Sequence, residues 1–172
     1  MPYSIPAEIA EANRGFAIWQ PTDQFDHRAM VLRSVCEPEY QCAQLLFAYF
    51  KTTGMTHSWD EAEDELFGEN GMLGSLTRMV RLGSYLNLLE QDEMADLRLL
   101  ARLRNMYAHG RERQQFNEDP KASALVRNLR LYKKSPTLLS HDDQGIFLSC
   151  YNFLVSRLRQ RAQSLPHTPS AA

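Results

Sequence analysis

An arginine, an asparagine and a histidine lie close together in the segment 103–110, which reads LRNMYAHG. Arg104 carries a permanent positive charge that can hold a phosphate through two hydrogen bonds. His109 is the side chain best suited to proton transfer near neutral pH. Asn105 could orient either the phosphate or the histidine. These three residue types are the minimum set for cleaving RNA without a metal ion, or simply for binding a phosphate.

The same residues also have a purely structural interpretation. Arg104 could pair with a carboxylate such as Asp96 or Glu93, and His109 could bond the carbonyl groups at the end of its helix. On an uninterrupted helix, residues five apart point about 140° away from each other, so one chain does not bring Arg104 and His109 onto one face. Two copies meeting across a twofold axis would solve this problem, each supplying one Arg and one His. A catalytic motif therefore predicts a homodimer.

Basic residues concentrate around the motif. Residues 1–97 contain 6 Lys/Arg and 16 Asp/Glu, a net charge of −10, whereas residues 98–134 contain 10 and 3, a net charge of +7. A positive field around a phosphate-binding motif favours a polyanionic ligand such as RNA. The candidate nucleic-acid ligands are Arg98, Arg102, Arg111 and Arg113. The alternative, which the sequence leaves open, is that these charges solvate helix faces or pair with the acidic half, including across a dimer.

The elements that would position these residues are helical. Apolar residues recur at spacings of three and four, and no run alternates with the period of two typical of a strand. We predict a single-domain, all-α bundle of about six or seven helices over residues 21–165, with an N-terminal arm at 1–20 and a disordered tail at 166–172. The first expected helix is capped by Thr22 or Asp23, with a new start or a kink at Pro38. A short helix follows Ser58 and runs from Trp59 to Phe67, and a longer one runs from Gly74 to about Leu89. Asp92 is expected to cap the motif-bearing helix, which stops at Gly110, Asp119 to cap a helix to about Leu131, and Ser140 or Asp142 to open the last helix.

The composition narrows the class of protein. With 44% hydrophobic and 23% charged residues the chain reads as an ordinary globular protein. No apolar segment approaches the roughly 18–20 residues that span a membrane, and the N-terminus lacks a secretion signal. Cys36, Cys42 and Cys150 lack zinc-site spacing and are expected to be reduced and mostly buried, and the acidic cluster at 61–65 to be a solvated face. We expect a cytoplasmic protein without membrane partner, cofactor or metal.

Two resemblances to known families cover the middle of the chain. The residues Arg104, Asn105 and His109 resemble the R-N-x-x-x-H signature of the HEPN superfamily, helical domains that include many ribonucleases. Residues 71–116 are similar to the mannitol operon repressor family, which shows a G-x-L-G-x-L segment, a long helix, a short acidic linker and a helix ending in an R-x-x-x-x-H-like sequence. The segment 71–76, GMLGSL, carries the first part of that match, and Phe116 continues it.

The two resemblances imply different functions on an all-helical fold. The HEPN resemblance implies a metal-independent endoribonuclease, a toxin or defence effector restrained by a protein antitoxin or regulatory partner. Arg104 would then stabilise the scissile phosphate and His109 would transfer a proton, leaving a cyclic phosphate and a 5′-hydroxyl. The repressor resemblance implies a non-enzymatic transcriptional regulator that acts through protein partners. Arg111 stands where some HEPN toxins carry a tyrosine for modification by a partner nucleotidyltransferase, which argues against that pairing.

The geometry of the motif distinguishes the two functions. Convergence of Arg104 and His109 in an open basic cleft would favour the enzyme. Burial of the motif in carboxylate pairs would favour the regulator.

Overall fold

The computed structural model describes residues 27–68, 70–109, 116, 118–134 and 142–166. Over these residues the chain is all-α and contains no strand, which confirms the predicted fold class. The predicted arm at 1–20 and all but the first residue of the predicted tail lie outside them. The elements are α2 (His27–Thr52), α3 (Trp59–Ala62), the π-helical turn η1 (Glu63–Phe67), α4 (Leu76–Tyr85), α5 (Gln91–His109), α6 (Pro120–Arg127), α7 (Arg130–Lys134) and α8 (Asp143–Ser164).

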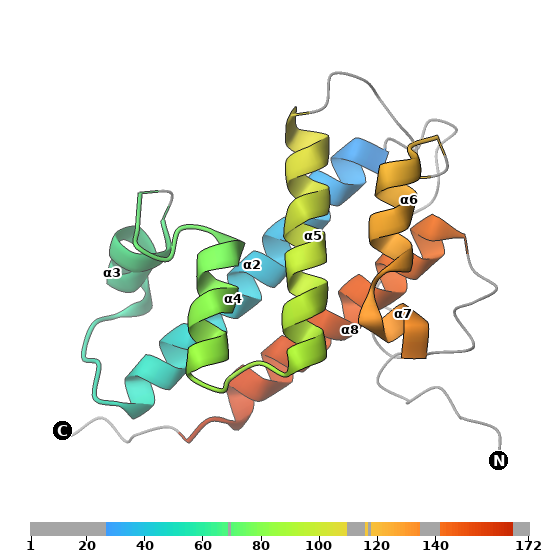
Figure 1. The fold of residues 1–172 in the computed structure, drawn as a ribbon. Helices are drawn as coiled ribbons and strands as arrows, with labels where there is room; N and C mark the ends of the chain where they lie inside the picture. Colours follow the sequence, from blue (N-terminus) through green and yellow to red (C-terminus); the bar gives the residue numbers. More distant parts are fainter. Residues whose placement is uncertain (1–26, 69, 110–115, 117, 135–141, 167–172) are drawn as a thin grey trace, which may run out of the picture.

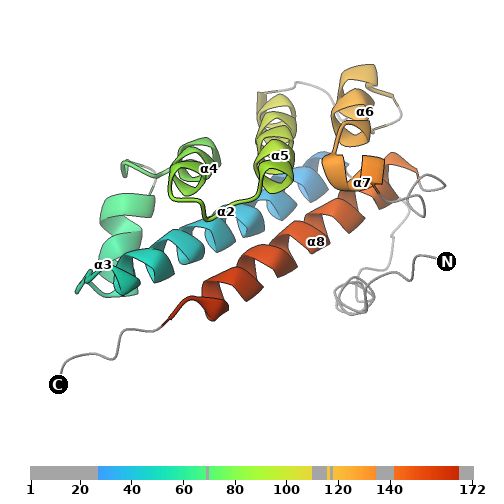
Figure 2. The ribbon, with the colours of Figure 1, turned by 60° about the horizontal axis from the view of Figure 1, so that its bottom comes forward.

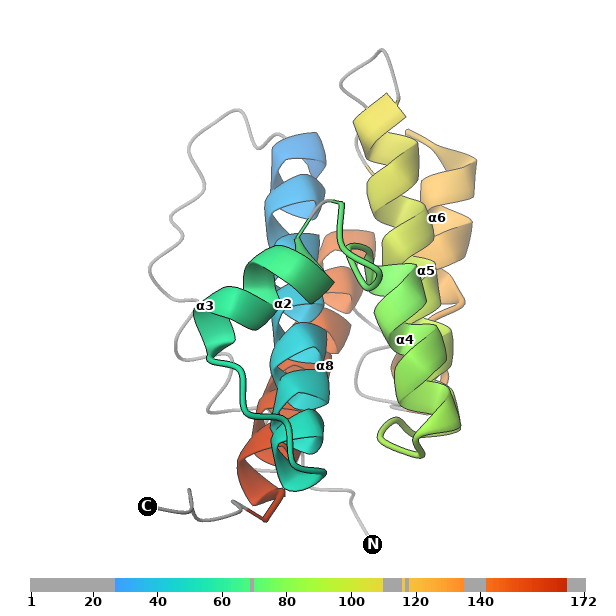
Figure 3. The same cartoon turned by 90° about the vertical axis from the view of Figure 1, so that its left-hand side faces the viewer.

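The helices are arranged in two layers (Figure 1). α2 and α8 lie side by side in one layer, and α4, α5 and α6 lie across them in the other. Figure 2 and Figure 3 show the two layers from below and from the side, with α3 at one end of the molecule. α5 is the middle helix of its layer and packs against α2, α4, α6 and α7. One side of α5 is therefore buried, and its outer side is left uncovered by the other helices.

Pro38 lies inside α2, a single helix of 26 residues. A proline within a helix removes one hydrogen bond and costs about 3 kcal/mol, which is why a new start or a kink was expected there. Val31 and Val35 before it and Leu45 and Leu46 after it are each at most 2% exposed. Because each buried aliphatic side chain contributes about 1.5–3 kcal/mol, burial on both sides of Pro38 outweighs the lost bond. The predicted start of this helix at residues 22–23 lies outside the described residues.

A tight turn at Asn87 separates α4 from α5. The predicted helix to Leu89 ends four residues early, at Tyr85. Asn87 has a φ of 56°, and the N–H groups of Asn87 and Leu88 donate to the carbonyls of Ser84 (3.2 Å) and Gly83 (2.8 Å). This pair of bonds is the Schellman arrangement, and asparagine tolerates the left-handed conformation that it needs. The turn returns the chain so that α4 and α5 form an antiparallel pair.

The first turn of α5 is fixed to α8 by a buried charge cluster. Glu93 accepts hydrogen bonds from both terminal nitrogens of Arg161, at 2.5 and 3.0 Å, and its side chain is only 5% exposed. Arg161 also donates to the carbonyl of Leu88 at 2.8 Å. The Glu93 carboxylate in addition accepts from the N–H of Glu90, so α5 begins at Gln91 rather than at the predicted cap Asp92. A paired and hydrogen-bonded buried carboxylate fixes this end of α5 firmly.

The predicted helix from Asp119 to Leu131 is divided into α6 and α7. Asp119 caps α6 as expected, with its carboxylate accepting from the N–H groups of Lys121 and Ala122. The break at residues 128–129 follows from Asp96 of α5, which accepts from the N–H groups of Arg130 (2.6 Å) and Leu131 (3.2 Å). A carboxylate at this place satisfies the free donors of a new helix start. The residue that causes the break lies 34 positions earlier in the sequence.

Two further predicted helix starts are confirmed by their caps. Ser58 and Glu61 form the reciprocal capping box of α3, and Asp142 accepts from the N–H of Gly145 at the start of α8. In the part of the chain that the structure describes, no helix combines the length and the apolar character needed to cross a membrane.

Candidate nucleic-acid interface

Between residues 98 and 109 the outer face of α5 carries four exposed polar side chains: Arg98, Arg102, Asn105 and His109. They are separated by four, three and four positions. At 100° per residue they fall within a sector of about 60° around the helix. We call these four residues the α5 stripe. It combines two guanidinium groups, one amide and one imidazole on a single exposed face.

Arg104 lies on a different side of α5 from the stripe. Its Nη1 is 3.7 Å from Oε2 of Glu39 on α2, and its side chain is 38% exposed. The second oxygen of Glu39 accepts from the N–H of Leu76, the first residue of α4, at 2.9 Å. The sequence had suggested Asp96 or Glu93 as partners for Arg104, and that suggestion is wrong because those carboxylates bond α7 and α8. One copy of the chain thus separates Arg104 from His109, as the helical spacing predicts.

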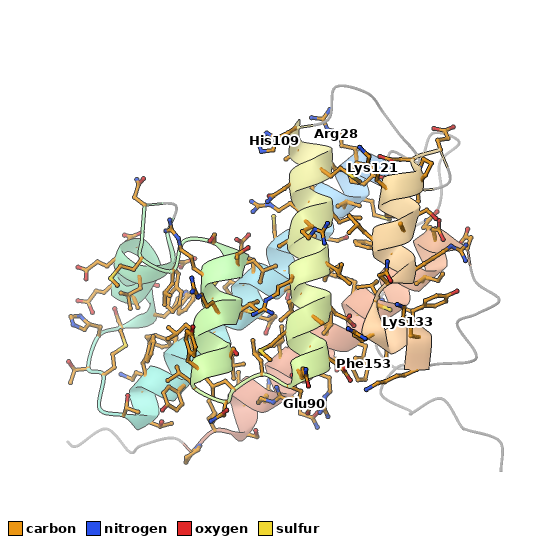
Figure 4. The ribbon with its side chains drawn as sticks, viewed as in Figure 1. Arg28, Glu90, His109, Lys121, Lys133 and Phe153 are labelled. Carbon is orange, nitrogen blue, oxygen red and sulfur yellow. The ribbon has the colours of Figure 1, made fainter. Side chains whose placement is uncertain are left out.

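His109 is the last residue of α5 and is exposed. Figure 4 shows it at the free end of the helix, with Arg28 of α2 beside it. The guanidinium of Arg28 donates to the carbonyl of Ala108 at 3.4 Å, so a cation from α2 also stands at this helix end. Cations are stabilised there because the carbonyls of the last turn lack helical partners. An imidazole and a guanidinium are therefore gathered where an anion could approach from solvent.

The basic residues around the motif divide into two groups. Arg98 and Arg102 of the α5 stripe have no carboxylate within 4.0 Å among the described residues, and the same holds for Arg81 on α4. Figure 4 shows Lys121 near the same end of the molecule as His109, at the start of α6. The second group is paired: Arg104 with Glu39 (3.7 Å), Arg127 with Asp143 (2.7 Å) and Lys134 with Asp92. Arg130 and Lys133 belong to neither group of pairs, since neither has a carboxylate within 4.0 Å among the described residues and Lys133 donates to the side chain of Asn128 at 2.7 Å.

The sequence left two structural roles open for the basic block, solvation of helix faces and pairing with carboxylates, and different residues take the two roles. Pairing with the acidic half accounts for Arg104 and Lys134, whereas Arg127 pairs with Asp143 of α8. The arginines of the α5 stripe are not neutralised by any carboxylate in the described part of the chain and can therefore meet a polyanion. The candidate ligands Arg111 and Arg113 lie outside the described residues.

Aromatic packing holds the end of α5 in place. Tyr107 packs edge-on against Phe116 (5.9 Å between ring centres), and Phe116 packs against Phe147 of α8 at 5.5 Å. Burial, and to a lesser extent the nearby charge of Asp119, raises the pKa of Tyr107 to about 12, so its hydroxyl stays neutral. Tyr107 therefore anchors the helix that presents His109 and is not itself an acid–base group.

The remaining candidate groups offer no second centre. Cys42 and Cys150 are buried and Cys36 is exposed, and burial raises the pKa of Cys150 to about 12. The acidic cluster at 61–65 is exposed at its four carboxylate positions, as predicted. Within the described ranges, no group of three or more His, Cys, Asp or Glu side chains is placed to hold a metal ion.

The sequence analysis missed Glu39. Its pairing with Arg104, 65 positions away, leaves no signal in the local sequence.

Comparison of the chain with protein-family models, with curated proteins and with solved structures gives no match. The resemblances to the HEPN superfamily and to the mannitol operon repressor family therefore stay predictions.

Proposed function

We propose that this protein is a homodimeric endoribonuclease that cleaves RNA without a metal ion and uses His109 as its acid–base group. The observation that supports this function best is the α5 stripe, in which an exposed imidazole and amide share one helix face with two arginines that have no carboxylate partner among the described residues. Uncompensated arginines attract the phosphate backbone, and the imidazole can move protons near neutral pH. A cytoplasmic toxin or defence effector, restrained by a protein partner, is the role that fits this activity.

The proposed reaction is a transesterification at phosphorus. His109 takes the proton of a ribose 2′-hydroxyl, the 2′-oxygen forms a bond to phosphorus, and the bond from phosphorus to the 5′-oxygen breaks. The leaving oxygen takes up a proton from water or from the imidazole of the second copy. A guanidinium stabilises the charge that develops on the non-bridging oxygens, and Asn105 orients the phosphate. The products are a 2′,3′-cyclic phosphate and a 5′-hydroxyl.

A second copy is needed to bring Arg104 beside a His109, because these two residues point about 140° apart on one helix, whereas Arg98 and Arg102 share the face of His109 in each copy. Two α5 helices facing each other across a twofold axis would set an arginine of one copy beside His109 of the other. Arg104 can contribute, since its side chain is 38% exposed and its 3.7 Å approach to Glu39 is longer than a hydrogen bond.

The decisive experiment is RNA cleavage in EDTA by wild-type protein and His109→Gln. Loss of one positioned acid–base group should lower the rate about 10²–10⁴-fold. The fold should be kept, because His109 is exposed at the end of its helix. The matched control is His57→Gln, an exposed histidine in the loop before α3, which should cleave like wild type. End-group analysis should find the cyclic phosphate. Equal trace activity in wild type and His109→Gln would mean contamination and would defeat the enzyme proposal.

One observation favours a second candidate, a non-enzymatic regulator of the mannitol operon repressor type. Arg104 of the motif contacts a carboxylate, Glu39, which also caps α4, so the arginine can be read as part of the fold. In this case the α5 stripe would bind nucleic acid or a protein partner without cleaving anything. Binding of RNA or DNA that is weakened by Arg102→Gln, together with intact RNA after long incubation, is the result that selects the regulator.

A further inference from the structure

A pocket of about 440 Å³ opens where α2, α3, η1, α4 and α5 meet. It contains none of the residues of the α5 stripe and shares only Arg104 with the residues proposed for cleavage. Its walls include three aromatic rings, two carboxylates and one guanidinium, from Tyr40, Trp59, Phe67, Glu39, Glu63 and Arg104. This volume lies in the range of small-molecule sites, which runs from about 300 to 1,000 Å³.

The three rings form a connected aromatic wall. Tyr40 meets Trp59 edge-on, with ring centres 5.8 Å apart and planes at 84°. Phe67 stacks on Trp59 at 5.7 Å and 23°. Phe47 supports Trp59 from a third direction, edge-on at 5.3 Å. Because the negative face of an aromatic ring attracts a cation, a wall of three connected rings is a favourable surface for an alkylammonium group.

The charges in the pocket favour a cation over an anion. Glu39 and Glu63 carry two negative charges against the one positive charge of Arg104, so the lining has a net charge of −1. Glu39 is held in place by the N–H of Leu76 at 2.9 Å. Its other oxygen is 3.7 Å from Arg104, beyond hydrogen-bond distance, and so keeps capacity for a second positively charged group.

We propose that this pocket binds a monovalent organic cation of the alkylammonium class. The aromatic wall takes the methyl or methylene groups, and the two carboxylates neutralise the charge. A divalent metal ion is a poor fit, since hard cations prefer six or more oxygen ligands and the pocket offers rings instead. Apart from Arg104 the site has no counterpart in the sequence motif, because its walls come from residues spread between positions 36 and 104.

The binding experiment uses choline as the probe and 3,3-dimethyl-1-butanol as its neutral isostere. The chain has two tryptophans, so a Trp19→Phe variant makes the fluorescence of Trp59 the reporter of the pocket. Choline should change the emission with saturation in the millimolar range, with sodium chloride as the ionic-strength control. The neutral isostere should bind at least about fivefold more weakly, because it lacks the cation–π and charge attraction. Equal binding of both compounds, or no saturation by choline, overturns the proposal.

A matched pair of variants tests the carboxylate. Glu63→Gln removes a charge that lines the pocket, whereas Glu65→Gln removes one from the same exposed turn outside the lining. Only Glu63→Gln should weaken choline binding, by about three- to fivefold for one partly screened charge. Equal weakening by both variants would trace the effect to general surface charge and contradict a defined site.

The rate of alkylation of Cys36 is an independent test of whether choline occupies the pocket. Cys36 also lines the pocket, and it is exposed whereas Cys42 and Cys150 are buried. Choline at saturating concentration should slow its reaction with a thiol reagent, and the neutral isostere at the same concentration should not. An unchanged alkylation rate in saturating choline places the cation elsewhere and rejects this pocket.

Discussion

Asp96 shows how one buried side chain can set the course of the chain. It is 2% exposed, and its two oxygens accept from the first N–H groups of α7. Burial raises the pKa of the Asp96 carboxyl, and the hydrogen bonds from Arg130 and Leu131 offset this only in part. The carboxylate of Asp96 is therefore buried at some cost in free energy, and in return its hydrogen bonds start a second helix, α7, against α5. The motif-bearing helix is thereby fixed to its neighbour.

The first residue-scale prediction concerns Asp96→Ala. The substitution leaves two partly buried N–H donors without their acceptor, so the free energy of unfolding at pH 7 should fall by about 1–3 kcal/mol. Urea unfolding followed by circular dichroism measures it. Asp60→Ala, at an exposed aspartate of α3, is the control and should stay within about 0.5 kcal/mol of wild type. Equal stability of Asp96→Ala and wild type would show that water replaces the carboxylate without loss.

The same residue predicts a pH dependence. Because the folded-state pKa of Asp96 is raised, the folded state binds its proton more tightly than the unfolded state does. The stability of wild type relative to the non-titrating Asp96→Asn is then greatest below the usual aspartate range of about 4 and falls as the pH rises through the raised pKa. Unfolding series between pH 4 and 7.5 should show this slope. A relative stability that rises with pH would contradict it.

At the scale of the element, α5 divides its residues between two tasks. Its inner side holds the core residues Leu97 and Leu100, at most 1% exposed, while its outer side presents the α5 stripe. Glu93 fixes the start of the helix to α8, and Tyr107 packs near its end. A helix held at both ends presents its outer side chains in a defined geometry, which is what a nucleic-acid-binding surface requires.

Salt dependence of RNA binding tests the α5 stripe as a unit. Arg98→Gln and Arg102→Gln, made in the inactive His109→Gln background, should each lower the slope of log K against log salt by about 0.7, the value for one single-strand phosphate contact. Arg159→Gln is the control, since this exposed arginine lies on α8 in the other layer and pairs with Glu37 at 3.1 Å. Slopes that are equal in all variants would mean that the stripe is only a solvated face.

At the scale of the whole molecule, the charge asymmetry of the sequence becomes a spatial one. The acidic α3 and η1 lie at one end of the molecule, and α6 lies at the other (Figure 1). The basic outer face of α5 stands between them in the α4–α6 layer. A polyanion is drawn toward the α5–α6 side and repelled from the α3 side, so it has a preferred direction of approach.

A mixing experiment tests the proposed dimer directly. In a site shared between two copies, Arg104→Gln supplies an intact His109 and His109→Gln supplies an intact Arg104. Each variant alone should be inactive, but a refolded equimolar mixture should recover about a quarter of wild-type activity, because half of the dimers are mixed and one of their two sites is complete. Sedimentation should show a dimer throughout. No recovery in a mixture that does form mixed dimers would exclude a site shared in this way.

The sequence determined the features that depend on neighbours along the chain. The helical spacing of apolar residues predicts the all-α fold, and Ser58, Asp119 and Asp142 mark helix starts because a cap bonds N–H groups only two or three residues away. The spacing of Arg104 and His109 likewise predicts their separation on α5. Each of these follows from the fixed geometry of a single helix, so no tertiary contact was needed.

The tertiary structure alone decided the features that join distant residues. Pro38 stays inside α2 because burial of side chains on both sides of it outweighs one lost backbone hydrogen bond. α6 stops because the carboxylate of Asp96 accepts hydrogen bonds from the first N–H groups of α7. Glu39 becomes the partner of Arg104, and the aromatic pocket forms, only when α2, η1, α4 and α5 converge. Which basic residues stay unpaired was settled in the same way, since charge neutralisation depends on distance in space and not on position in the chain.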